Sequence, residues 1–92
     1  MKKYLIERNI PGIGAMDSQQ LRAAAVKSNQ VLAELGPGVQ WQQSFVTDDR
    51  LFCIYFANDK SLVKKHADVA GFPADRILEI QRTIDPSVDT AA

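Results

Sequence analysis

The sequence predicts a single α+β domain whose elements run β-α-β-β-α-β, the order of a ferredoxin-like plait. Three observations lead to this fold class. Two segments repeat apolar residues at spacings of three and four, which is typical of helices. A chain of 92 residues has the length of one small domain. Four further segments are rich in β-branched and aromatic residues, as strands are: residues 3–10, 39–47, 51–57 and 76–84.

The first strand and the first helix have clear boundaries in the sequence. The strand at residues 3–10 ends at Pro11–Gly12, a pair that favours a loop. Asp17 or Ser18 is a suitable N-cap for the helix, because its side chain can accept a hydrogen bond from a free backbone N–H group. Gly36 stands where a C-cap glycine belongs, so we expect the helix to end there.

The remaining elements are bounded in the same way. Asp48–Asp49 separates two strand segments and predicts a hairpin. The segment 51–57 is almost unbroken in its apolar character, which is typical of a strand buried on both faces. Asn58 or Asp59 is a suitable cap for the second helix, and Gly71 ends it.

Handedness and polarity predict the order of the strands. Both crossover connections through a helix should be right-handed. With the second and third strands joined as a hairpin, the result is an antiparallel sheet ordered 4-1-3-2, with both helices on one face. The third strand is the most apolar, as a central strand should be. The second strand and the fourth, which carries Glu79, Gln81 and Arg82, are polar enough for edges.

Because the helices cover one face only, alternation along each strand divides the side chains between two faces. The helix-covered face is expected to hold Tyr4, Ile6, Phe52, Ile54, Phe56, Leu78 and Ile80. The helix-free face is expected to hold Leu5, Glu7, Asn9, Trp41, Gln43, Phe45, Cys53, Tyr55, Ile77, Glu79 and Gln81.

The helix-free face is too apolar for a monomer, so the sequence predicts a homodimer that buries this face. A carboxylate buried there needs a partner, a proton or a metal ion, which makes the face a candidate site. The alternative interpretation is that Glu7 and Glu79 lie at the sheet margins in water. The candidates for lining a cavity on this face are Glu7, Trp41, Gln43, Tyr55 and Glu79.

Composition excludes several classes of protein. Eleven basic and 11 acidic residues cancel, so the excess of positive charge that nucleic-acid binding needs is missing. The single cysteine, Cys53, allows no intrachain disulfide, and no apolar run is long enough to cross a membrane. We therefore expect a cytoplasmic protein. Residues 1–84 are expected to form the domain, and residues 85–92 a mobile tail.

Two single residues could carry chemistry. His66 is the only histidine, and imidazole serves as a metal ligand or as an acid–base group. Its spacing from Leu62 and Ala70 favours a hydrogen-bonded histidine between helix and sheet instead. Cys53 lies in the most apolar strand, where a small buried side chain is the better interpretation than a nucleophile. Motifs of the phosphate loop, the zinc proteases, the redox dithiols and the serine hydrolases are absent.

Three stretches of the chain resemble a family of small bacterial proteins. They are YLIERNIPG, QWQQSFVTDDRLFCIYFA and HADVAGFPADRILEI, and the resemblance covers residues 3–82. The family is largely uncharacterised and is associated with nickel binding. The resemblance implies a ferredoxin-like fold, a homodimer and a nickel ion. Imidazole, thiolate and carboxylate suit nickel, so the candidate ligands are His66, Cys53 and Glu7, with Glu79 or a second subunit completing the set.

The sequence is compatible with three functions. The first is a dimeric nickel-binding protein. The second is a cofactor-free enzyme of the monooxygenase or isomerase kind, with Glu7 as the base and a small-molecule cavity on the helix-free face. The third is an interaction module without a ligand.

Overall fold

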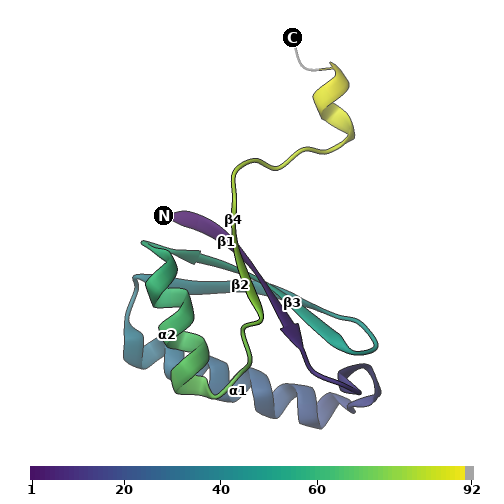
Figure 1. Ribbon diagram of the computed structural model, residues 1–92, viewed down its shortest axis with the longest axis vertical. Helices are drawn as coiled ribbons and strands as arrows, with labels where there is room; N and C mark the ends of the chain where they lie inside the picture. Colours follow the sequence, from purple (N-terminus) through teal and green to yellow (C-terminus); the bar gives the residue numbers. More distant parts are fainter. Residues whose placement is uncertain (91–92) are drawn as a thin grey trace.

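The computed structural model describes residues 1–90 and contains one four-stranded sheet with two helices (Figure 1). All strand pairings in it are antiparallel. The strands are β1 (Lys2–Asn9), β2 (Val39–Val46), β3 (Arg50–Ala57) and β4 (Arg76–Ile80), and the helices are α1 (Ser18–Leu35) and α2 (Lys60–Ala70). The strand order is β2-β3-β1-β4. Counted from the other edge, this is the predicted order 4-1-3-2, and the architecture is compatible with a ferredoxin-like plait.

The helix ends follow from their capping residues. Asp17 Oδ1 accepts a hydrogen bond from the backbone N–H of Gln20 at 2.8 Å, and Gln20 Oε1 accepts one from the N–H of Asp17 at 3.0 Å. This reciprocal capping box satisfies two backbone donors at the start of α1. Asp59 caps α2 by accepting a hydrogen bond from the backbone N–H of Leu62, and Gly71 ends the helix at φ 75°, a left-handed conformation that glycine adopts without strain.

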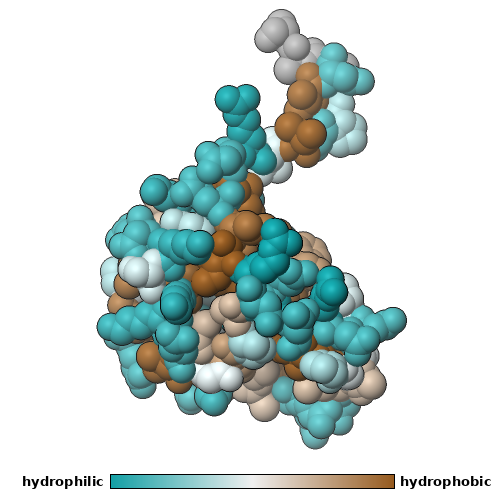
Figure 2. All heavy atoms as spheres, in the orientation of Figure 1, coloured by the Kyte–Doolittle hydropathy of each residue, from teal (hydrophilic) through white to brown (hydrophobic). Residues whose placement is uncertain are grey.

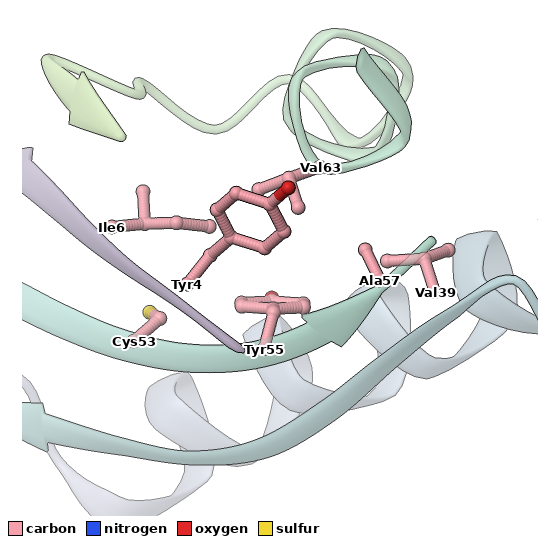
Figure 3. Close-up of a cluster of buried hydrophobic side chains, with 7 residues drawn as sticks. All are labelled: Tyr4, Ile6, Val39, Cys53, Tyr55, Ala57 and Val63. Carbon is pink, nitrogen blue, oxygen red and sulfur yellow. The ribbon is translucent and has the colours of Figure 1, made fainter. Parts of the chain in front are cut away.

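Both helices pack on the same face of the sheet. The core cluster joins Tyr4 and Ile6 of β1 to Tyr55 of β3 and Val63 of α2, and Leu32 of α1 packs against it. Figure 3 shows this cluster, with Tyr4 lying close to Val63. Within residues 1–90, neither helix combines the length and the apolar character that a membrane crossing requires.

The prediction for the faces of β3 was wrong. Tyr4 and Ile6 face the helices as expected, and Tyr55 and Cys53 stand directly opposite them in the ladder. Paired residues share a face, so Tyr55 and Cys53 are buried beneath the helices. Phe52, Ile54 and Phe56 therefore lie on the helix-free face. Because this strand is apolar on both faces, its alternation does not reveal its phase.

The faces of β4 are also exchanged with respect to the prediction. Ile77 pairs with Ile6 and packs on the core, whereas Leu78 and Ile80 lie on the helix-free face. Glu79 stands on the covered side at the sheet margin, where it pairs with Lys2 at 3.7 Å. The strand ends at Ile80, so the predicted continuation to residue 84 was wrong as well.

A bulge in β2 changes the face of the sheet on which Trp41 lies. The register with β3 shifts between Trp41 and Gln43, so that one extra residue stands in β2. Trp41 pairs with Tyr55 and turns to the covered side, whereas Gln43 and Phe45 keep the helix-free side as predicted. Strict alternation cannot reveal such a bulge, and it misplaced Trp41 for this reason.

The chain leaves the body of the domain after β4 (Figure 1). Residues Pro86–Thr90 form a short 3-10 helix within the segment predicted as a tail. Ile84 is 77% exposed and Val88 is also exposed. Figure 2 shows hydrophobic side chains on this extension. Residues 91–92 of the predicted tail lie outside the described residues.

Candidate functional site

A cavity of about 500 Å³ lies between α1, the sheet and the loop after β1. It owes its space to small side chains on α1, because Ala24, Ala25 and Ser28 face the sheet there. The cavity is partly open to solvent, because exposed residues such as Met16 and Val46 belong to its lining. The loop residues Ile10 and Ile13 close one side.

The walls are apolar and the polar groups are few. Ile13, Leu21 and Leu51 supply aliphatic surface, and Trp41 and Phe72 supply rings. Among the lining residues, Met16 and Val46 are exposed large hydrophobic side chains, whereas Ser28 and Tyr55 are buried. The cavity thus combines an apolar wall with a small polar group deep inside, the usual composition of a site for a small organic molecule.

Arg8 is the most unusual residue of the cavity. Its residue exposure is 1%, and its Nη1 donates a hydrogen bond to the carbonyl oxygen of Pro73 at 2.6 Å. Its guanidinium carbon lies 5.7 Å from the centre of the Phe72 ring. Nη2 has no hydrogen-bond partner within residues 1–90. Buried arginine is normally paired, so this one stands out.

The adjacent Glu7 points away from the cavity. It accepts a hydrogen bond from Arg50 Nη1 at 3.2 Å and lies 3.9 Å from Arg76 Nη1. Phe52 is its partner in the ladder, so all of these side chains belong to the helix-free face. Glu7 therefore neutralises exposed arginines and leaves Arg8 unpaired. The proposed catalytic base is not part of the cavity.

His66 is fully buried behind the cavity. Its Nε2 lies 3.2 Å from Ser28 Oγ, and its ring centre lies 5.2 Å from that of Tyr55. Burial is the largest effect and lowers the pKa of His66 below 6.5; a hydrogen bond with the Ser28 backbone opposes it, and the nearby Arg8 charge adds to the lowering. The ring is thus neutral near pH 7. The interpretation of His66 as a hydrogen-bonded histidine between helix and sheet is confirmed.

Tyr55 and Cys53 of β3 line the cavity on the side of the sheet. Burial, the largest effect, raises the pKa of the Tyr55 phenol, and neighbouring Ser28 and Arg8 only partly oppose this. Tyr55 is therefore a protonated hydroxyl group at neutral pH. Trp41 Nε1 donates to Ser44 Oγ, which donates to Cys53 Sγ, both at 2.9 Å. This chain of hydrogen bonds holds the thiol as a small buried group.

The structure does not bring the proposed nickel ligands together. Glu7 lies on the helix-free face, whereas Cys53 and His66 are buried on the covered face. Within the described part of the chain, no group of three or more histidine, cysteine, aspartate or glutamate side chains is arranged to hold a metal ion. The donors of a single chain therefore do not fit a nickel site.

The predicted cavity residues are divided in a similar way. Trp41 and Tyr55 line the cavity, but Gln43 lies on the helix-free face and Glu79 at the sheet margin. The cavity itself forms on the covered side of the sheet. Arg8 was missed, although a signal was present: it shares the phase of Tyr4 and Ile6, so alternation places a charge on the core face.

Comparison with known proteins gives two matches. No curated protein matches the chain. The crystal structure of SCO4226 from Streptomyces coelicolor A3(2) is similar, with a TM-score of 0.75 and 19% sequence identity, over 89% of this chain and 99% of that one. At this identity the likeness shows the fold. The model of the family described as "Nickel responsive protein SCO4226-like" matches residues 4–80. The chain therefore belongs to the SCO4226-like family of nickel responsive proteins, in agreement with the resemblance found in its sequence.

Proposed function

We propose that this protein is a binding module for a small, mainly apolar organic molecule, held in the cavity between α1 and the sheet. The observation that carries this proposal is the cavity itself, whose volume of about 500 Å³ lies within the usual range of small-molecule sites. Binding is proposed rather than catalysis, because the candidate base Glu7 lies on the other face of the sheet.

A neutral fluorescent probe tests this proposal without reference to charge. N-phenyl-1-naphthylamine brightens when it enters an apolar site, so wild-type protein should enhance its emission. Ala25→Phe fills the cavity from α1 and should weaken probe binding about tenfold or more. Ala33→Phe adds the same ring to an exposed position of the same helix and should bind like the wild type. Unchanged binding by Ala25→Phe would show that the probe sits elsewhere and would overturn the proposal.

The protein is further proposed to act as a homodimer through its helix-free face. This face holds Leu5, Phe45, Phe52, Ile54, Phe56, Leu78 and Ile80. Phe45 is 52% exposed and Leu78 is 42% exposed, an apolar surface that monomers rarely present.

A second copy suits this face because its charges are self-complementary. Glu7 provides negative charge near the end of β1, and Arg50 and Arg76 provide positive charge beside it. A two-fold arrangement places the same patch on both subunits, so that groups of opposite sign can meet across the interface. Two such sheets can pack face to face over their apolar residues.

Nickel binding is a second proposal, supported by the description of the family. Of the candidate ligands His66, Cys53 and Glu7, only Glu7 lies on the helix-free face, so a nickel site shared between two chains would use Glu7 and not the buried His66. Calorimetric titration of apo-protein with NiCl₂ should give the same affinity for wild type and His66→Ala. A lower affinity in a correctly folded His66→Ala would contradict this expectation and make the buried imidazole a ligand.

A further inference from the structure

Among residues 1–90, the side chains that line the cavity carry one formal charge, and no acidic side chain forms an ion pair with it. Of the side chains that line the cavity, Arg8 alone is permanently ionised. The acidic group next to it in sequence, Glu7, is engaged by Arg50 and Arg76 on the opposite face. Within residues 1–90, no carboxylate forms an ion pair with Arg8.

A buried charge without a counterion is costly, because it loses its hydration and gains no partner in return. One bond to the Pro73 carbonyl and the ring of Phe72 satisfy part of the guanidinium. Within residues 1–90, Nη2 has no hydrogen-bond partner, although it is buried and its residue lines the cavity. Replacing this arginine by a hydrocarbon would remove the cost, so its presence indicates a role for the charge.

We infer that the ligand of the cavity is an apolar carboxylic acid whose carboxylate is bound by Arg8. This inference rests on the proposed function, namely that the cavity holds a small molecule. A guanidinium presents planar donors that match the two oxygens of a carboxylate. The hydroxyl group of Tyr55 is buried in the lining of the same cavity, and a phenol can donate one further hydrogen bond.

The walls define the rest of the ligand. Apart from these polar groups, the cavity is lined mainly by aliphatic and aromatic side chains, so the body of the ligand is expected to be apolar. A phosphate fits less well than a carboxylate. It carries up to two charges and three exposed oxygens, and a single arginine in an apolar cavity would leave some of them without partners.

Three eight-carbon probes that differ in their head group test this inference. Octanoate, 1-octanol and octyl phosphate are titrated calorimetrically into wild type, Arg8→Met, Arg8→Lys and Arg82→Met. Wild type should bind octanoate at least about tenfold more tightly than octanol, as a charge-assisted hydrogen bond implies. Arg8→Met should lose this preference and keep its affinity for octanol, whereas Arg8→Lys should retain part of it. Arg82→Met removes the same charge from an exposed position and should behave like the wild type.

The outcomes separate this inference from the proposed function. Equal affinity of wild type for octanoate and octanol would overturn the role of Arg8 and leave the binding function intact. Tighter binding of octyl phosphate than of octanoate would overturn the carboxylate assignment. If none of the three ligands binds and N-phenyl-1-naphthylamine also fails, both proposals are wrong. Should Arg8→Met fail to fold, the preference of the wild type and its partial retention in Arg8→Lys still decide the question.

Discussion

At the scale of single residues, the hydrogen bond between His66 and Ser28 joins the two helices in the interior of the domain. His66 lies on α2 and Ser28 on α1, and both are buried. Their hydrogen bond satisfies one nitrogen of a ring that is otherwise surrounded by Tyr55 and Phe72. Such a ring is stable in its neutral form, because the imidazolium would be a second unpaired charge close to Arg8.

This environment predicts that stability depends on pH through His66. The ring titrates near 6.5 in the unfolded chain and lower in the folded protein. Between these two pKa values the unfolded chain binds more protons, so the free energy of unfolding should fall as the pH decreases below 6.5. Urea unfolding at pH 7.5 and pH 5.5 measures how much the free energy of unfolding falls between these two pH values. This fall should be smaller in His66→Gln and unchanged in Lys65→Gln, a substitution at the exposed neighbouring position. A loss of equal size in His66→Gln would contradict the assignment.

At the scale of elements, the cavity depends on how the loop after β1 rests on the β2–β3 hairpin. Gly14 donates from its backbone N–H to the carbonyl oxygen of Asp48 at 3.0 Å, and Ile10 donates to that of Asp49 at 2.9 Å. Ile13, which lines the cavity, lies between these two anchored positions. The hairpin end thereby fixes one side of the cavity.

A methyl group at Gly14 should separate these two elements. A Cβ atom there would lie 2.8 Å from the Cα atom of Asp48 and 2.8 Å from the carbonyl oxygen of Thr47, closer than such contacts occur. Gly14→Ala should therefore lower the free energy of unfolding by about 1–3 kcal/mol, measured by urea denaturation. Ala15→Ser, at the next and exposed position, should change it by less than about 0.5 kcal/mol. If Gly14→Ala had the same free energy of unfolding as the wild type, the loop would not be held tightly against the hairpin.

The sequence predicted the elements better than their faces, for a physical reason. Caps such as Asp17 and Gly71 are local signals, since each acts on backbone groups within one turn. The orientation of β3 depends on its partners, because residues 51–57 are apolar on both sides. The bulge after Trp41 is a property of the pairing between two strands and has no local signature. The cavity could not be predicted from the sequence for the same reason, because it forms where small residues of α1 face the sheet.

At the scale of the whole molecule, the two faces of the sheet have different roles. The covered face holds the core and the cavity, and the helix-free face holds the apolar residues proposed for dimerisation. Alternation places Arg8 of β1 on the first face and Glu7 on the second. The proposed ligand binding by Arg8 and the proposed dimerisation through the face that holds Glu7 therefore involve adjacent residues of one strand.

The proposed dimer predicts the effect of a single charge. Ile54 lies in the central strand β3 on the helix-free face. Ile54→Glu would bury a carboxylate between the two sheets, so it should convert the dimer into a monomer in sedimentation velocity experiments. Val69→Glu places the same charge on the exposed surface of α2 and should leave the dimer intact. A wild-type monomer, or a dimer that survives Ile54→Glu, would contradict the proposed interface.

The bond from Arg8 to the Pro73 carbonyl has a consequence for communication between the two faces. It ties β1 to the connection between α2 and β4, the strand whose Leu78 belongs to the helix-free face. In the proposed complex a ligand bound to Arg8 would contact this tie, and the neighbouring residue of the strand, Glu7, belongs to the helix-free face. Thermodynamic reciprocity would then require that a ligand that tightens subunit association is bound more tightly by the associated form, by the same factor.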